Sequence, residues 1–381
     1  MIRELVTEMQ KGIWNWYPFE ENAEILYLNK STYQELEGTK KYDYIIGIYV
    51  LEYEVNPRKF LEKCKLLLRE NGKLLLAMDN RLGIRYFCGD RDPYTGRNFD
   101  GVENYRRVSM VDRDKMAGCA YDKATVNQLL DEVGFVSLEC FSVFPSIDAP
   151  QLLYAEGYLP EEDMSMRYFT YYNYPDTVFL EEEYLYEDLI KNNMFHQMAN
   201  GYLFECALKK SDCEKCNIKH ITLSMDRGVN CAMATMICNN NSVIKKPLYQ
   251  QGIAGLHTLC ENHENLKACG ISVVDGKLGA DTYIMPYVSG ENAVVYLQNL
   301  LRTDKERFIH KMDEFRQIIL QSSEHVKAKL SDYEKKEYPE IEDGIWLKKG
   351  YFDLVPLNAI CVDGEYVFFD QEFCIENYPA N

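Results

Sequence analysis

The stretch YDYIIGIYVLEY, residues 42–53, is a continuous apolar run of the kind found in a strand that is buried on both faces. Residues 57–68 follow it with apolar side chains at helical spacing, and Glu70-Asn71-Gly72 interrupts that pattern. A second apolar run, KLLLAMDN, occupies residues 73–80. Strand, helix and strand in this order predict a βαβ unit with parallel strands and a right-handed crossover, so the expected fold class is α/β.

The chain of 381 residues is long enough for two domains, and its sequence separates into three segments. Residues 1–160 alternate strand-like and helix-like stretches. Residues 161–217 are acidic and rich in tyrosine, so we expect a helical connector that packs on a neighbour rather than a free linker. Residues 218–381 begin with three strand-like runs, carry a long helical pattern over 304–330 and end with the hairpin pattern AICVDGEYVFFD.

The composition disfavours several classes of function. With 42 basic and 60 acidic residues the net charge is −18, which opposes binding to a phosphate backbone, so we expect no nucleic-acid partner. The opening MIRELVTEMQKG lacks the apolar core of a signal peptide, and no apolar run reaches the ~18–20 residues of a membrane span. The 13 scattered cysteines do not suggest a compact disulfide framework. These features predict a cytoplasmic protein with reduced thiols.

Several motifs of the first segment point to one family. They are YDYI at 42–45, VLEY at 50–53, ENGKL at 70–74 and, most specific, DNRLGIRYFCG at 79–89. Together they resemble class I S-adenosylmethionine (SAM)-dependent methyltransferases, in particular the branch that is joined to kinase-like domains and modifies bacterial surface polysaccharides. The resemblance covers residues 13–160. It implies a Rossmann-like sheet, SAM as methyl donor, a glycan or sugar acceptor and a glycosyltransferase complex as partner.

One part of that fold is missing from the sequence. Such enzymes hold SAM on a glycine-rich loop after the first strand, and an acidic residue after the second strand holds the ribose. Here the first-strand candidate ends at Leu28, and Gly38 is the only glycine before the next strand begins at Tyr42. The 13 intervening residues suffice for about one crossover of ~10–12 residues, so the second and third strands do not fit. We therefore expect a reduced sheet with Ile25–Leu28 as its edge and a degenerate SAM site.

A remaining ligand site should lie at the carboxyl ends of the strands, where open α/β sheets bind ligands. Glu52 and Tyr53 follow the first buried run, and Asp79 and Asn80 follow the second. These four are the predicted cofactor-binding residues of the first domain. The alternative for Asp79-Asn80 is an ordinary strand-end turn, and the alternative for the domain is a non-catalytic scaffold or interaction module.

The third segment contains YFDLVPLN at 351–358, in which Asp353 and Asn358 have the spacing of the kinase catalytic loop. Asp370 follows at the distance where kinases place the aspartate that binds Mg²⁺. The segment thus resembles a small α+β kinase-like domain. The resemblance implies ATP and Mg²⁺, with Asp353 as the catalytic residue and Asn358 and Asp370 as metal ligands. The alternative for both aspartates is ordinary hairpin polarity.

Upstream, VIKK at 243–246 resembles the strand whose lysine contacts the nucleotide phosphates. The resemblance implies this role for Lys245 or Lys246, paired with a glutamate of the following helix, Glu261 or Glu264. YIMPYVSG at 283–290 resembles the hinge between kinase lobes.

The kinase-like segment also departs from that pattern. Gly228 is the only glycine near the first strand turn, and 11 residues follow Asp370, which leaves no activation segment. Protein kinase activity is therefore not expected. The alternatives are phosphate transfer to a small molecule or glycan end, nucleotide binding without turnover, and a pseudokinase scaffold.

Two questions stay open at this stage. Cys213 and Cys216, with His220 nearby, have the spacing of half a zinc site, but no second such pair lies close in the sequence. The sequence also leaves open whether the protein is a homo-oligomer and whether a partner chain covers the edge at Ile25–Leu28.

Overall fold

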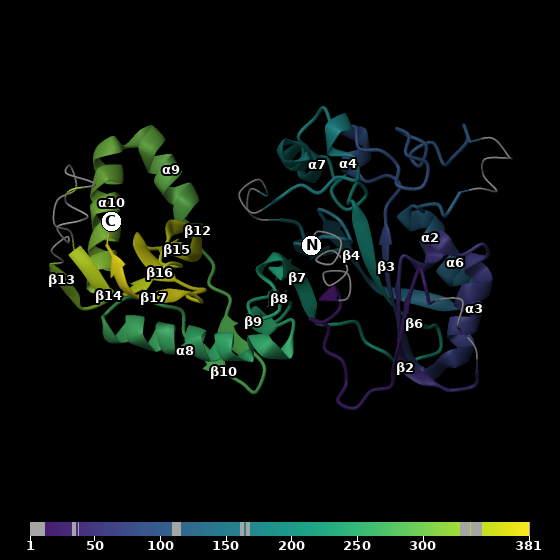
Figure 1. Ribbon diagram of the computed structural model, residues 1–381, viewed down its shortest axis with the longest axis horizontal. Helices are drawn as coiled ribbons and strands as arrows, with labels where there is room; N and C mark the ends of the chain where they lie inside the picture. The colour runs from purple at the N-terminus through teal and green to yellow at the C-terminus, as the bar shows by residue number, and fades with distance from the viewer. Residues whose placement is uncertain are drawn as a thin grey trace. The chain divides into compact units, whose positions relative to one another are not determined.

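The computed structural model describes residues 12–32, 36, 38–108, 116–160, 164, 168–327, 336 and 345–380 (Figure 1). The chain folds as two units, Met1–Asn240 and Asn241–Asn381. This division falls later than the boundaries expected at residues 160 and 217. The reason is that residues up to Cys238 contribute strands to the sheet of the first unit.

The first unit is built on a mixed sheet. Its described strands are β1 (Ile25–Asn29), β2 (Tyr42–Ile48), β3 (Leu68–Asp79), β6 (Gly201–Leu208), β4 (Phe135–Phe144), β5 (Leu152–Ala155), β7 (Ile218–Leu223) and β8 (Met233–Cys238), in this spatial order. The first three strands are parallel, and β6 runs antiparallel to its neighbours β3 and β4. The helix α3 (Pro57–Leu67) connects β2 to β3, so the predicted βαβ unit and the α/β class are confirmed.

β1 pairs directly with β2, from Ile25 opposite Tyr44 to Asn29 opposite Ile48. In the described part of the chain, no strand lies on the other side of β1. The prediction that two strands are missing and that Ile25–Leu28 forms the edge is therefore confirmed.

Two helices cover one face of this sheet, α3 and α6 (Lys123–Val133), which lie side by side in Figure 1. Asn56 caps α3 by accepting a hydrogen bond from the amide of Lys59, and Asp122 caps α6 in the same way. Gly134 ends α6 with φ 97°, a left-handed conformation that glycine adopts without strain. The helices bury a continuous apolar core against β2, β3 and β4.

An aromatic segment at residues 12–19 covers the opposite face. The Tyr17 hydroxyl donates to Glu205 Oε1 at 2.6 Å, and Lys73 Nζ contacts the same oxygen at 2.7 Å. Trp16 packs edge-on against Phe141, with ring centroids 5.5 Å apart. These contacts connect the segment to β3, β6 and β4, so it replaces a helical layer on this side.

The segment expected to be a helical connector is mostly irregular. It holds the short elements η3 (Pro175–Thr177), η4 (Glu182–Tyr184) and α7 (Tyr186–Lys191), and then β6, a fully internal strand. Residues 161–163 and 165–167 lie outside the described residues. The tyrosines do pack, because Tyr168 and Tyr186 are buried in the core of the first unit.

The second unit contains three small antiparallel groups of strands. They are β9 (Ser242–Pro247), β11 (Tyr283–Pro286) and β10 (Lys277–Leu278); β12 (Glu291–Asn292), β15 (Ala359–Val362) and β16 (Glu365–Phe368); and β13 (His325–Lys327), β14 (Ile345–Tyr351) and β17 (Cys374–Pro379). Its helices are α8 (Ile253–Ala268), α9 (Ala293–Thr303) and α10 (Lys305–Gln321).

The hairpin prediction for the second unit is confirmed. β15 and β16 pair around Asp363 and Gly364, which have φ values of 51° and 86°, as a tight hairpin turn requires. The long helix predicted over 304–330 ends earlier, at Gln321, because the chain turns into β13. Of the described helices, none combines the length and the apolar character needed to cross a bilayer.

Candidate functional site

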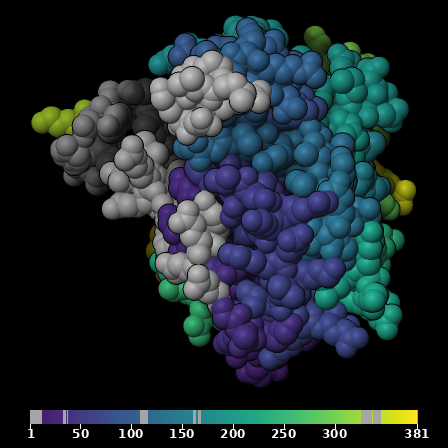
Figure 2. Space-filling view, turned by 90° about the vertical axis from the view of Figure 1, so that its right-hand side faces the viewer, coloured from purple at the N-terminus to yellow at the C-terminus, as the bar shows by residue number. Residues whose placement is uncertain are grey.

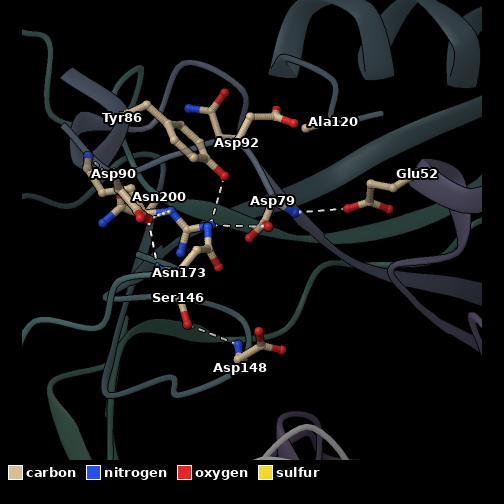
Figure 3. Close-up of polar contacts among 12 residues, drawn as sticks. Glu52, Asp79, Tyr86, Asp90, Asp92, Ala120, Ser146, Asp148, Asn173 and Asn200 are labelled. Atoms are coloured by element: carbon tan, nitrogen blue, oxygen red, sulfur yellow. Dashed lines mark hydrogen bonds and ion pairs between the residues drawn. The ribbon is translucent and has the colours of Figure 1, made fainter. Parts of the chain in front are cut away.

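The candidate site of the first unit lies where β2 and β3 end. After β2 the chain turns at Tyr49, with φ 57°, into the one-turn helix α2 (Val50–Tyr53) that carries Glu52. β3 ends at Asp79, whose amide donates to Glu52 Oε1 at 3.0 Å (Figure 3). Two of the predicted residues are therefore in direct contact at the carboxyl edge of parallel strands.

Both carboxyl groups are buried and incompletely hydrogen-bonded. Glu52 is 1% and Asp79 3% exposed, and Glu52 Oε2 and Asp79 Oδ1 have no hydrogen-bond partner within the described residues. Burial, reinforced by the charge of Asp79, raises the pKa of Glu52 well above its ordinary value. Burial also raises the pKa of Asp79 to about 7, although Arg85 opposes the shift. Each acid thus favours its protonated form and keeps one oxygen without a partner among the described residues, a combination typical of ligand sites.

Arg85, on the short helix α4 (Ile84–Phe87), is the buried cation of this site. Its Nη2 donates to Asp79 Oδ2 at 3.2 Å and to the Tyr86 hydroxyl at 2.8 Å, and its Nε lies 3.7 Å from Asp90 Oδ2. Figure 3 shows Asp79, Tyr86 and Asp90 around this point. Buried carboxyl groups outnumber the guanidinium, so the site retains an excess of acid.

The carboxylate of Asp90 connects this site to the connector segment. It accepts the amides of Asn173 and Tyr174 at 3.0 and 2.8 Å (Figure 3). Sequence analysis assigned no role to Arg85 or Asp90, although Arg85 lies within the quoted run 79–89. The available signal was a second cation, six residues after a strand-end aspartate and directly after the apolar Ile84.

Aromatic rings border the acidic pair. Tyr53 and Tyr94 pack edge to face with centroids 5.7 Å apart, and Lys30 Nζ lies 5.7 Å from the Tyr53 centroid. Burial raises the pKa of Tyr53, and the neighbouring charges of Glu52 and Asp79 add to the shift. Aromatic faces and buried acids both favour a cation.

Asn80 has a different role from its neighbour Asp79. Its Nδ2 donates to the carbonyl of Ala199 at 2.7 Å and to that of Gln197 at 3.0 Å, and its Oδ1 accepts the amide of Leu82. These bonds fix the turn after β3 against the start of β6. The turn alternative therefore describes Asn80, while Asp79 keeps an unpartnered oxygen.

The described residues at and directly after the end of β1, 29–32, form no glycine-rich cradle for a ligand. Residues 29–32 form a tight turn in which the Thr32 amide donates to the Asn29 carbonyl at 3.0 Å and the Ser31 amide donates to Asn29 Oδ1 at 2.8 Å. The side chains of this turn stand where a close backbone approach would need glycine. The residues present fit the charged end of SAM better than its adenosine.

In the second unit, Lys245 on β9 is 1% exposed and its Nζ contacts the carboxylates of Asp370 and Glu372. Asp353 Oδ2 accepts the amide of Phe373 at 2.7 Å, and Asn358 Nδ2 donates to the Asp353 carbonyl at 3.2 Å. Burial raises the pKa of Asp353. The fold thus collects Asp353, Asn358 and Asp370 around the β16–β17 connection, together with Lys245.

The expected pairing of this lysine with a helix glutamate is not what the structure shows. Glu261 is exposed on α8, and Glu264 contacts Lys267 instead. The observed carboxylates come from Asp370 and Glu372, because the chain after β16 returns to β9. Lys246 is partly buried on the alternate face of the same strand. Sequence analysis missed Glu372, two positions after Asp370.

The described residues form no metal-binding cluster of side chains. Among the described residues, no group of three or more His, Cys, Asp and Glu side chains could hold a metal ion. The Cys213 thiol donates to the Asn71 carbonyl at 3.2 Å, the Cys216 amide donates to Glu205 Oε2, and the His220 ring stacks on Tyr154. The half zinc site is therefore used for packing.

Comparison with known proteins adds a likeness of fold. No family model and no curated protein sequence matches the chain. A SAM-dependent methyltransferase from Thermotoga maritima is 8% identical, with a TM-score of 0.29, and the match covers 55% of this chain and 90% of that one. An O-methyltransferase of a polyketide multienzyme from Brevibacillus brevis, solved with S-adenosyl-L-homocysteine, is 15% identical, with a TM-score of 0.26 and coverages of 54% and 74%.

The plantazolicin methyltransferase, solved with S-adenosyl-L-homocysteine and a substrate analogue, gives 11% identity, a TM-score of 0.25 and coverages of 55% and 85%. The similar solved structures are thus SAM-dependent methyltransferases over about half of this chain. At these scores the likeness carries no argument about function, which has to rest on the site itself.

Proposed function

We propose that the protein is a methyltransferase-like transferase of bacterial surface-glycan synthesis, acting in the cytoplasm, whose first unit binds the charged end of SAM at Glu52 and Asp79. The observation that carries the proposal is the pair of buried carboxyl groups with unpartnered oxygens at the ends of neighbouring parallel strands. The glycan context and a glycosyltransferase partner rest on the sequence resemblance of residues 13–160 alone.

The chemistry of the site suits a cationic ligand. A sulfonium bound beside Glu52 and Asp79 would favour the ionised form of these buried acids, and Tyr53 and Tyr94 supply aromatic faces beside it. When bound, SAM would supply an electrophilic methyl group. Asp79, with a pKa of about 7, is suited to accept the proton of an acceptor hydroxyl near neutral pH. Because the side chains of the turn at 29–32 prevent a close backbone approach, we expect the adenosine part of SAM to bind weakly.

The test is a comparison of thermal stability with SAM and with S-adenosylhomocysteine, which lacks the methyl group and the sulfonium charge but keeps the amino-acid end. Ligand at about 100 times its Kd adds roughly 2.7 kcal/mol to stability. We expect SAM to stabilise the protein more than S-adenosylhomocysteine, and Glu52→Gln or Asp79→Asn to remove the difference. Glu62→Gln, an exposed carboxylate on α3, is the matched control.

Each result decides the proposal. Equal stabilisation by both compounds would show that the sulfonium charge does not contribute to binding. Stabilisation by neither compound would favour the alternative of a non-catalytic scaffold in a glycan-synthesis complex. Unligated melting curves of the variants show whether a lost response reflects lost folding.

A second function is favoured by the arrangement around Lys245. The lysine and the residues predicted for phosphate transfer, Asp353, Asn358 and Asp370, lie within one connected group. ATP–Mg²⁺ would take Lys245 Nζ as a phosphate contact and Asn358 and Asp370 as metal ligands, which are too few to hold the ion without the nucleotide. We propose nucleotide binding here, with phosphate transfer to a small molecule or glycan end.

Binding of ATP–Mg²⁺, followed by calorimetry, tests this second function. Lys245→Met and Asp370→Asn should each weaken binding at least tenfold, whereas Lys246→Met, on the alternate face of β9, should not. If Lys246→Met is the variant that abolishes binding, the lysine assignment is wrong. If the unmodified protein binds no ATP–Mg²⁺, the second unit has no nucleotide function.

A further inference from the structure

The edge strand β1 presents an unused backbone surface. The Tyr44 amide donates to the Glu24 carbonyl, so the alternation of a parallel ladder directs the backbone groups of Leu26 and Leu28 toward β2. The N–H and C=O groups of Ile25 and Tyr27 therefore point away from β2. No described strand lies on that side.

The usable part of this edge is short and well defined. The outward groups of Asn29 are already occupied, because its amide donates to Thr32 Oγ1 and its carbonyl accepts the Thr32 amide, both at 3.0 Å. Before the strand, the chain turns through a bond from the Ala23 amide to the Glu20 carbonyl. Among the described contacts of β1, Ile25 and Tyr27 are thus the two residues whose outward backbone groups have no hydrogen-bond partner.

The side chains of these two residues are also exposed. Ile25 is 40% and Tyr27 37% exposed, and both project from the same face of β1, since they are two residues apart. This N-terminal region, purple in Figure 2, forms part of the surface on that side of the first unit. A β-branched residue and an aromatic residue form a favourable pair when they lie opposite each other on adjacent strands.

We propose that a second copy of this chain pairs with β1 in antiparallel fashion, with the two-fold axis at Leu26. This register places Ile25 of each copy opposite Tyr27 of the other, so that the available N–H and C=O groups form four hydrogen bonds and the exposed side chains form two cross-strand pairs. In this register the outward backbone groups and exposed side chains of β1 pair with those of an identical strand. The edge is therefore self-complementary, which favours a second copy of this chain as the partner.

The charges flanking β1 agree with antiparallel pairing. Glu20 and Glu21, before the strand, and Lys30, after it, are all exposed. Antiparallel strands bring the acidic start of each copy beside the basic end of the other. A parallel neighbour would place like charges together. The inference concerns a surface and is independent of the proposed function.

The first test is molar mass by sedimentation equilibrium over a wide concentration range. We expect a reversible dimer of the 44.5 kDa chain. Tyr27→Lys should raise the dissociation constant about tenfold or more, because it removes a ring from both cross-strand pairs and buries charge. Leu66→Lys, which adds the same charge at a 70% exposed apolar residue of α3, should leave the mass unchanged.

The second test fixes the register. At a two-fold axis the Leu26 Cα atoms lie about 4.5 Å apart, within disulfide range, whereas those of Tyr27 lie about 8 Å or more apart. Leu26→Cys should therefore cross-link to itself under mild oxidation, identified by peptide mapping, and Tyr27→Cys should not. A protein that stays monomeric, a dimer indifferent to Tyr27→Lys, or cross-linking through Tyr27→Cys alone would overturn the proposal.

Discussion

Each unit of this protein buries a cation among carboxyl groups, and the two sites differ in how completely those carboxyl groups are paired. In the second unit, one buried ammonium, Lys245, contacts the carboxylates of both Asp370 and Glu372. In the first unit, buried carboxyl groups exceed the guanidinium of Arg85, and Glu52 and Asp79 each keep an oxygen without a partner in the described structure. The difference indicates that the first site has unused hydrogen-bonding capacity for a ligand, whereas in the second the buried ammonium already contacts two carboxylates.

The unfolding of each unit can be followed separately by tryptophan fluorescence. Trp14 and Trp16 lie in the first unit and Trp346 in the second, and the sequence contains three tryptophans. Trp346→Phe therefore confines the fluorescence signal to the first unit. The double variant Trp14→Phe/Trp16→Phe confines it to the second.

The largest effect is expected from Arg85→Met. Removal of the guanidinium leaves Asp79 and Asp90 buried without compensation, which should lower the free energy of unfolding of the first unit by about 3–5 kcal/mol. Chemical denaturation checks this value. Adding Asp79→Asn to the variant should restore part of the loss, and a loss below about 1 kcal/mol would show that the carboxyl groups are already neutral.

Lys245→Met should have a smaller effect and lower the free energy of unfolding of the second unit by about 1.5–3 kcal/mol. The side chain of Asp370 is 30% exposed, so water can solvate this carboxylate once the ammonium is gone, and most of the loss should come from Glu372, which is 8% exposed. The measurement is the same, with Trp346 as the probe. A cost larger than that of Arg85→Met would reverse the comparison between the two sites.

The pH dependence should distinguish the sites further. Asp79 has an ordinary pKa of 3.8 and a folded pKa of about 7, so between these values the folded chain holds a proton that the unfolded chain has released. The contribution of Asp79 to stability is therefore lost as pH rises from about 4 to about 7. Asp79→Asn should remove this slope and stabilise the first unit by about 1 kcal/mol or more at pH 8.

The informative quantity is the difference between wild type and Asp79→Asn at each pH, which cancels the titration of other carboxyl groups. Glu52→Gln should act in the same direction, since burial raises the pKa of Glu52 as well. If the stability difference between wild type and Asp79→Asn stays constant from pH 4 to 8, the pKa of Asp79 is not raised in the folded protein.

The smallest effect is expected from Lys246→Met. This residue is next to Lys245 but projects from the alternate face of β9, so its removal should change stability by less than about 0.5 kcal/mol. Thermal unfolding of the Lys245→Met and Lys246→Met variants, measured in parallel, tests this expectation. Similar losses for both would mean that the contacts of Lys245 are not what stabilises the second unit.

Local pattern was enough to predict the parallel core of the first unit. The runs at 42–53 and 73–80 specify β2 and β3, and the 13 residues between Leu28 and Tyr42 exclude further strands between β1 and β2. Asp79 ends β3 as this pattern predicts. The strand expected over 42–53 is shorter, because the chain turns at Tyr49 and Glu52 lies on the helix α2.

What escaped prediction depends on contacts between distant residues. β6 comes from residues 201–208 yet pairs with β3, and no local signal specifies that neighbour. Arg85 and Glu372 were missed for the same reason, since their partners become apparent only when the chain returns. Glu372 contacts Lys245, which lies 127 positions earlier.

The late arrival of β6 has a consequence for synthesis on the ribosome. β3 is complete at Asp79, but its neighbour β6 is not finished until Leu208, so a growing chain carries β3 as a bare, highly apolar edge while more than a hundred residues are added. At about 5–20 residues per second this interval lasts on the order of ten seconds. Nascent chains of this protein are therefore exposed to edge-to-edge aggregation at β3 for that time, and chaperone capture should be strongest for chains that end before residue 208.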